Sequence, residues 1–433
     1  MEAFAGFAIF VIALLAFLAT GIPVAVATGL IGIIGTYIFI SPVAVVHIAT
    51  VAFSTSSYFI LTVVPLFILM GEALSVTGIG RDLFRAAQIW LQRIPGSLAV
   101  GTIFACTGFS SVCGSSPVTA ATIGALAVPE MVRHGYDRRL AFGVTAAGGT
   151  LGILIPPSIA MILYGVITET SIGDLFIAGL LPGILIAGLL SLTVIALVLA
   201  KPTLAPRLRE TFTWAERFGS LTVVFPVLVL AFLVLGSIYF GVATPTEAGA
   251  VGAAGALGIA AISRKLNSEI IGKIFGNTVR TTAMFMLLLI GGLFSAFMLT
   301  RLGVPQGMAK ALIALDLPPW MIVVLINLLL MVLGMFMDPM SVLVIIVPVF
   351  FPAILAMGYD PVWFGVLVII NIEIAAISPP VGFNLFVLKS VVPDATLSEV
   401  IRGALIFIVP LASGILLLIL FPQIALYLPS LVK

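Results

Sequence analysis

An internal duplication restricts the possible folds of this chain more than any other feature. A Gly-Tyr-Asp tripeptide at 135–137 precedes a proline pair at 156–157, and the same tripeptide at 358–360 precedes a proline pair at 379–380. Both landmarks recur after 223 positions. Because two independent landmarks share one spacing, we interpret the chain as two related repeats.

Composition excludes a soluble globular protein. Of the 433 residues, 62% are hydrophobic and only 8% are charged, whereas a soluble domain has about 25% charged residues. We therefore predict an all-α polytopic membrane protein with about ten crossings. Residues 43–53 are short for a span, and either an interfacial segment or an eleventh span fits them. The apolar segments of spanning length are 4–20, 22–40, 58–77, 138–168, 175–200, 219–240, 245–263, 281–300, 361–389 and 403–428.

Two longer apolar regions, 96–134 and 318–357, are each interrupted by a turn. The turns contain Ser116-Pro117 and Asp338-Pro339, in which a capping residue precedes a proline. We therefore expect Ser116 and Asp338 to be helix N-caps. Both regions are interpreted as helical hairpins. Hydropathy is compatible with two full crossings and with re-entrant loops.

Basic residues are distributed unevenly between the two sides of this map. Arg301, Lys310 and Lys433 fall on one side, and the other sixteen fall on the opposite side. By the positive-inside rule, the side with sixteen is cytoplasmic and the C-terminus lies outside. The sixteen are Arg81, Arg85, Arg93, Arg133, Arg138, Arg139, Lys201, Arg207, Arg209, Arg217, Arg264, Lys265, Lys273, Arg280, Lys389 and Arg402.

The number of crossings between the repeats predicts their relative orientation. Five crossings separate the matching motifs at 71–75 and 291–295, and an odd number inverts the second repeat. An inverted-topology repeat with two hairpins and two broken helices is typical of secondary transporters. The predicted divisions are N-terminal spans at 1–57, repeat 1 at 58–200, linking spans at 201–280 and repeat 2 at 281–433.

Charges at helical spacing predict two amphipathic arm helices on the membrane surface, at 80–94 and 266–278. The broken helices are expected at 138–168 and 361–389, where the proline pairs free backbone carbonyls. In hydrocarbon, such carbonyls are tolerated only against protein or a polar cavity.

Polar groups at the breaks predict two kinds of site. Loose carbonyls beside hydroxyls suit a small cation. Helix N-termini beginning at Ser116-Pro117, Asp338-Pro339 and Ser378-Pro379 suit an anion. Asp338 and Glu373 are costly charges within apolar segments, so we expect each to face a polar cavity.

Enzymatic functions find little support in the sequence. Gly272-Lys273 is followed by Ile274, so this stretch is not a phosphate-binding loop, and the two histidines form no HExxH motif. No cofactor and no nucleic-acid partner are expected. Two alternatives to a multi-component transporter remain. One is a stand-alone sodium-coupled carboxylate carrier or sodium/proton exchanger with the same plan, and the other is a channel or structural subunit.

Several motifs closely resemble the large membrane subunit (M, DctM-type) of tripartite ATP-independent periplasmic (TRAP) transporters. They are Gly114–Gly124, Ile155–Ser158, Met337–Pro339 and the run Pro379–Phe386. The resemblance implies an elevator-type carrier in the bacterial inner membrane, driven by sodium as the coupling ion. It also implies two partners, a separate small four-helix membrane subunit and a periplasmic solute-binding protein that delivers an organic acid such as a dicarboxylate or sialic acid.

With the ion identified by this resemblance, we expect two sodium sites, with no transition metal. The first lies between the first hairpin tip and the first break, at Gly114, Ser115, Ser116, Gly148, Gly149 and Pro156. The second lies between the second tip and the second break, at Gly334, Asp338, Glu373, Ser378 and Pro379. The solute is expected between the tips, at Thr150, Asn371 and Asn384, with its carboxylate at helix N-termini.

Overall fold

The computed structural model describes residues 2–207, 212–392 and 394–432, and the regular secondary structure in these ranges is helical. Arg209 and Lys433, which the charge analysis assigned to opposite sides, lie outside the described residues. The α-helices, in chain order, are α1 (Glu2–Ala19), α2 (Val24–Phe39), α3 (His47–Ser56), α4 (Val63–Ser75), α5 (Ile79–Leu91), α6 (Ser97–Cys113), α7 (Ser116–Arg133), α8 (Arg138–Leu154), α9 (Ile159–Thr168), α10 (Ile172–Ala200), α11 (Trp214–Tyr239), α12 (Pro245–Ile262), α13 (Ser268–Arg301), α14 (Val304–Ile313), α15 (Pro319–Gly334), α16 (Pro339–Ala356), α17 (Pro361–Ala376), α18 (Phe383–Val391), α19 (Leu397–Leu420) and α20 (Gln423–Val432). Short 3₁₀ turns are η1 (Val43–Val46), η2 (Phe59–Thr62) and η3 (Pro202–Leu204).

Apolar helices of membrane-spanning length confirm the polytopic class. In the described chain, six helices are long and apolar enough to cross a bilayer, and up to eight are if each bent helix pair is one span. One such pair joins 43–56 to 59–75 with a bend of 60°. The short segment at 43–53 is therefore part of a bent element that continues into α4.

Both hairpins are present where the sequence predicted them. Helices α6 and α7 form the first, and α15 and α16 form the second. Ser116 of the first tip is fully buried, whereas at the second tip Met337 is 5% exposed and Phe336 is 42% exposed. The carbonyls of Gly114 and Met335, at the two tips, accept hydrogen bonds from the broken helices. Tips that bond to the broken helices favour the re-entrant form over two full crossings.

The two broken helices are also present. Helices α8 and α9 are bent by 44° at residues 155–158, and α17 and α18 are separated by 377–382. The aspartate of each Gly-Tyr-Asp tripeptide caps the helix that follows. Asp137 accepts from the amides of Arg139 and Leu140, and Asp360 accepts from those of Val362 and Trp363.

Three predicted boundaries are wrong. The arm at 266–278 and the span at 281–300 form one helix of 34 residues, α13, because neither glycine nor proline stands between the two segments to interrupt the backbone. The span at 403–428 is divided, since α19 ends at Leu420 just before Pro422. No helix begins at Ser378-Pro379. Instead, α18 begins at Phe383 after Gly382, whose φ is +60°.

Contacts between helices come in matched pairs. Helix α2 packs on α13 as α12 packs on α4, and α1 packs on α14 as α11 packs on α5. Across the breaks, α9 packs on α16 as α18 packs on α7. This reciprocity is that of two halves related by a pseudo-two-fold axis. The matched contacts include α1, α2, α11 and α12, which lie outside the predicted repeats at 58–200 and 281–433.

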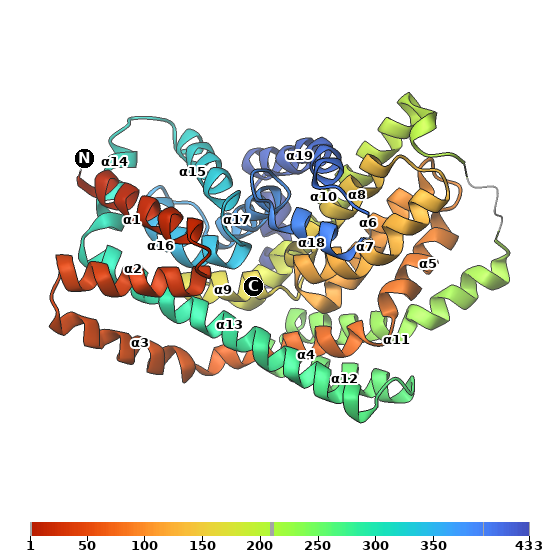
Figure 1. Cartoon of the computed structure of the whole chain (residues 1–433), viewed down its shortest axis with the longest axis horizontal. Helices are drawn as coiled ribbons and strands as arrows, with labels where there is room; N and C mark the ends of the chain where they lie inside the picture. The colour runs from red at the N-terminus through yellow and green to blue at the C-terminus, as the bar shows by residue number, and fades with distance from the viewer. Residues whose placement is uncertain (1, 208–211, 393, 433) are drawn as a thin grey trace.

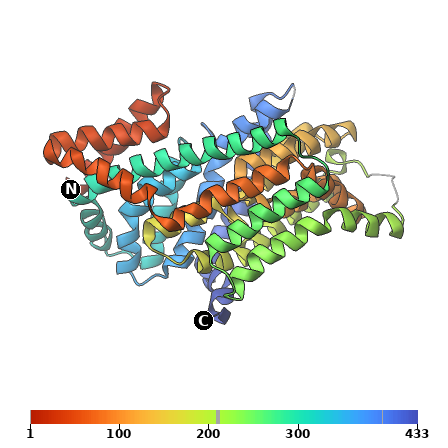
Figure 2. The same cartoon turned by 90° about the horizontal axis from the view of Figure 1, so that it is seen from below.

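The repeat places two sets of helices on different sides of the molecule. Helices α2, α3, α4, α12 and α13 lie along one long edge in Figure 1, and the hairpins and broken helices lie above them. Figure 2 shows the long helices of this edge running side by side. We call α2, α4, α12 and α13 the scaffold helices. The amphipathic helix α5 lies at one end of the molecule and its repeat counterpart α14 at the other.

Candidate functional site

The first hairpin tip lies directly against the first break. The amide of Ile159 donates to the carbonyl oxygen of Gly114 at 3.4 Å. A Cβ on Gly114 would come within 2.5 Å of the Pro157 carbonyl oxygen, and a Cβ on Gly152 within 2.6 Å of the Ser115 carbonyl oxygen. Gly114 also has a φ of +64°, so both its conformation and its surroundings require glycine.

Two predicted residues of the first ion site lie within a regular helix. Helix α8 continues to Leu154, so Gly148 and Gly149 precede the break. Gly148 packs on Cys106 of α6, and Gly149 packs on Ala120 of α7. Pro156 does lie in the break, where the Ser158 hydroxyl donates to the carbonyl of Ile153.

The N-cap of α7 is one residue earlier than predicted. Ser115 has extended dihedrals, and its carbonyl accepts the first helical hydrogen bond, from the amide of Thr119 at 3.0 Å. Ser116 is therefore inside the helix, and its hydroxyl is used elsewhere. No side chain caps the amides of this first turn.

The second hairpin tip contacts the second break through main-chain hydrogen bonds. The amides of Val381 and Gly382 both donate to the carbonyl of Met335, at 3.2 and 3.4 Å. Gly334 packs against Ala375 of α17. Asp338 is the predicted N-cap of α16, accepting from the amides of Met340 and Ser341, and it also accepts from the Ser341 hydroxyl.

Asn384 joins the two repeats at this point. Its side-chain amide donates to the Ser116 hydroxyl at 2.6 Å, and both residues are fully buried. Because Val381 and Gly382 hold the second tip while Asn384 holds the first, the segment 381–384 bridges the two tips. Helix α18, like α7, begins without a side-chain cap.

Glu373 and Thr150 face each other between the two broken helices. Glu373, on α17, is fully buried, and the groups facing it are the Thr150 hydroxyl and the amides of Ile153 and Leu154 on α8. None of these groups reaches hydrogen-bond geometry with either carboxylate oxygen, and the Thr150 hydroxyl donates to Ala147. Glu373 was assigned to the second ion site, yet it faces the break of the first repeat.

Asn371 lies two residues before Glu373 on α17, so it is on roughly the opposite side of the helix, against the second hairpin. Its side-chain amide donates to the carbonyl of Asn327 at 2.7 Å and to the Asn327 Oδ1 at 3.1 Å. Asn327 was not among the predicted site residues. Its position as a polar residue in the apolar region 318–357 is the signal that identifies it.

Buried acceptor oxygens without donors gather on the predicted site residues. Seven buried side-chain atoms in the described chain have no hydrogen-bond partner, and four of them are Asn371 Oδ1, both oxygens of Glu373 and Asn384 Oδ1. A buried polar atom without a partner costs about 1–3 kcal/mol, so such a concentration requires an explanation. Oxygens without donors are suitable ligands for a cation.

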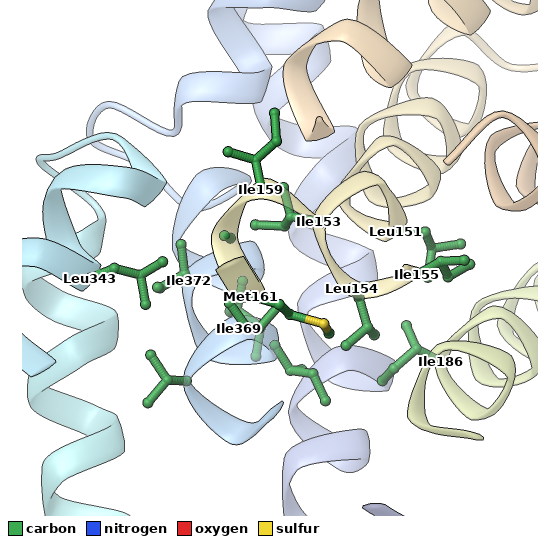
Figure 3. Packing of buried hydrophobic residues seen from close by; sticks show 14 of the residues in the cluster. Leu151, Ile153, Leu154, Ile155, Ile159, Met161, Ile186, Leu343, Ile369 and Ile372 are labelled. Carbon is green, nitrogen blue, oxygen red and sulfur yellow. The ribbon is translucent and has the colours of Figure 1, made fainter. Parts of the chain in front are cut away.

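Apolar packing surrounds these polar groups. Figure 3 shows Ile153, Leu154 and Ile159 of the first broken helix packed among Ile369 and Ile372 of α17, with Ile186 and Leu343 farther out. The first break is thereby shielded from the surrounding membrane, as unwound backbone at this depth requires.

The family model described as "Tripartite ATP-independent periplasmic transporter, DctM component" matches residues 11–424. The chain belongs to the DctM family. It is therefore a multi-pass permease component of a bacterial TRAP transporter and not an enzyme, in agreement with the predicted class.

Relatives of this DctM chain differ in the solute for which they are named. A C4-dicarboxylate TRAP transporter large permease protein of Pseudomonas aeruginosa is 37% identical, over 91% of this chain and 92% of its own length. A sialic acid TRAP transporter large permease protein of Vibrio cholerae is 36% identical, over 86% of this chain and 87% of its own.

The fold of this DctM chain also resembles a solved structure. The crystal structure of the Alcanivorax borkumensis YdaH transporter, described as having an unusual topology, matches with a TM-score of 0.65. The match covers 86% of each chain at 16% sequence identity. At this identity, the likeness concerns the fold alone.

Proposed function

We propose that this DctM component carries an organic acid inward across the membrane, driven by a sodium gradient. Its relatives are named for C4-dicarboxylates, sialic acid and ectoine, and a carboxylate is the chemical group that these compounds share. We propose two partners, a small membrane subunit and a periplasmic binding protein that delivers the solute. An isethionate relative named DctMQ supports the first, since this chain covers only 64% of that longer protein.

The buried oxygens without donors carry the sodium proposal. Asn384 Oδ1 adjoins the first tip, and the Glu373 carboxylate adjoins the first break. The tips add the main-chain carbonyls of Gly114 and Met335, which accept hydrogen bonds from the breaks. A few carbonyl and amide oxygens with one carboxylate suit a monovalent ion better than calcium, which prefers six to eight oxygen ligands.

Two uncapped helix N-termini support the placement of the solute carboxylate. The first turns of α7 and α18 have no side-chain cap, and they meet through the hydrogen bond from Asn384 to Ser116. Backbone amides at helix N-termini bind carboxylates without a cationic side chain. No lysine or arginine is among the buried polar residues of the described chain, so a fixed cation is not the carboxylate partner we propose.

Transport requires the solute site to be open first to one side of the membrane and then to the other. We propose that the hairpins and broken helices, α6–α9 and α15–α18, move as one mobile block against the scaffold helices. The amphipathic helix α5 and its counterpart α14 connect block and scaffold. The scaffold is the surface we propose for the small subunit. The distribution of basic residues supports an outer position for the C-terminus.

The test is uptake into proteoliposomes that contain this chain with its small subunit, supplied with the solute-binding protein loaded with labelled solute. We expect uptake only with an inward sodium gradient, and none with an equal potassium gradient. Equal uptake in potassium would remove the sodium proposal. Uptake without any binding protein would indicate a stand-alone carrier, and ion conductance without solute coupling would indicate a channel.

A further inference from the structure

A polar pocket of about 660 Å³ lies at the open end of the first hairpin, away from its tip, where four segments meet. These segments are the turn between α5 and α6, the turn between α7 and α8, the end of α10 with η3, and the first turn of α11. The polar and aromatic side chains that line it include Gln92, Arg93, Tyr136, Arg207, Phe212 and Arg217.

The pocket concentrates three arginines, Arg93, Arg207 and Arg217. None of its three arginines forms an ion pair with a carboxylate in the ranges that the structure describes. Glu216, the acidic neighbour of Arg217, is used in a capping box with Thr213. Several guanidinium ions gathered in a concave site create a positive potential that attracts anions.

Arg217 adds an independent observation. Its Nε is buried and has no hydrogen-bond partner among the described residues. The guanidinium carbon lies 4.7 Å from the centre of the Trp214 ring, so one face of the guanidinium is covered. Stacking uses the face of a guanidinium and leaves its in-plane N–H donors free for an anion.

We propose that this pocket binds a phosphate group, supplied either by an anionic phospholipid headgroup or by free phosphate. Guanidinium groups match phosphate oxygens with paired hydrogen bonds, which favours phosphate over a spherical anion. The neighbouring Leu199 is 63% exposed on the surface of α10, so the pocket borders an apolar face that acyl chains contact in a bilayer. All three arginines belong to the side expected to be cytoplasmic.

A phosphate bound in this pocket would link the end of α5 to the first turn of α11. Arg93 follows α5 and precedes the first hairpin, whereas Arg217 begins α11, which packs on α5. The bound anion would bridge these segments and regulate how freely the hairpin moves. The binding itself does not depend on the proposed solute or coupling ion.

The experiment compares Arg217→Gln and Arg93→Gln with Arg280→Gln, an exposed arginine on α13 that loses the same charge outside the pocket. In delipidated detergent, inorganic phosphate is titrated and thermal stability is followed. In nanodiscs, phosphatidylglycerol is compared with phosphatidylcholine, and bound lipid is counted by native mass spectrometry. Arg217→Lys keeps the charge and serves as the second variant if the glutamine variant does not fold.

We expect saturable stabilisation by phosphate, by phosphatidylglycerol or by both. The dissociation constant of the stabilising ligand should be at least tenfold higher in the two pocket variants and unchanged in Arg280→Gln. Stabilisation by inorganic phosphate alone identifies a free anion as the ligand, and retention of phosphatidylglycerol identifies a headgroup. Absence of saturable binding in both arms, or equal weakening in all three glutamine variants, would overturn the proposal.

Discussion

Glu373 is a fully buried carboxyl group whose two oxygens have no hydrogen-bond partner in the described chain. Replacement by glutamine keeps the size of the side chain and removes its charge. Because an uncompensated buried charge destabilises a fold, we expect Glu373→Gln to be at least as stable as the parent protein in sodium-free buffer. Sodium-driven uptake should fall at least tenfold.

Thermal unfolding and proteoliposome uptake, measured on the same preparation, test this prediction. Glu130→Gln is the control, since Glu130 forms a partly exposed ion pair with Arg133 and should change neither quantity much. If Glu373→Gln loses stability and uptake together, Glu373 has a structural role. If it keeps normal sodium dependence, it is not part of the coupling.

Asp338 combines a capping role with a predicted ion-binding role, and substitution by asparagine separates them. Asparagine caps helices as well as aspartate, so Asp338→Asn should change the free energy of unfolding by less than about 0.5 kcal/mol. Asp338→Ala should cost about 1 kcal/mol. We expect both variants to need more sodium for half-maximal uptake, by roughly tenfold, which corresponds to about 1.4 kcal/mol.

Asp360→Asn is the matched control, because Asp360 caps α17 in the same Asp-Pro context away from the hairpin tip. It should leave the sodium dependence unchanged. Equal sodium dependence in Asp338→Asn and the parent protein would limit Asp338 to capping.

The first hairpin tip depends on close backbone packing against the break, which makes Gly114 sensitive to a single methyl group. Gly114→Ala would be strained by its φ of +64° and would place Cβ 2.5 Å from the Pro157 carbonyl oxygen. We expect it to cost about 2–4 kcal/mol of stability and to abolish uptake. Gly358→Ala has a similar φ of +79° with nothing within 4 Å, and should cost only about 1 kcal/mol. Equal effects in thermal unfolding would show that the tip contact is unimportant.

Sequence patterns predicted the hairpins and broken helices because each has a local signal, a proline pair or a capping residue before proline. Local signals were less accurate about where a helix begins. Ser115 precedes Ser116, and either serine suits an N-cap. In the structure Ser115 has the N-cap dihedrals, and the Ser116 hydroxyl accepts from Asn384. Helix α18 begins at Phe383 because the chain first turns back to bond Met335.

Contacts between the repeats could not be predicted from the sequence. Asn384 and Ser116 are 268 positions apart, and neither spacing nor hydropathy relates them. The same holds for Glu373 facing Thr150, since a polar residue in an apolar helix indicates a polar partner but not which one. The continuous helix α13 was missed because a change from amphipathic to apolar character was taken for a boundary.

The reciprocal packing of the whole molecule supports an exchange between two conformations. Matched contacts such as α2 on α13 and α12 on α4 hold the scaffold helices together. The mobile block makes fewer contacts with these helices than they make with one another. If the two repeats exchange their conformations, a site reached from one side becomes reachable from the other. The elevator therefore requires the first hairpin to move relative to α4.

A disulfide between the block and the scaffold tests this requirement most directly. A Cβ on Gly71 of α4 would lie 3.4 Å from the Cα and 3.7 Å from the sulfur of native Cys113, beside the first tip. Gly71→Cys should therefore form a disulfide with Cys113 on oxidation. Gly71→Cys combined with Cys113→Ala cannot form it and controls for the added side chain.

The decisive measurement is sodium-driven uptake by the oxidised Gly71→Cys protein, with sodium binding measured in parallel on the same sample. We predict that uptake stops, that sodium binding persists, and that reduction of the disulfide restores uptake. Normal uptake through a fully crosslinked protein would contradict the elevator, because the site would then be reached from both sides without movement of the block.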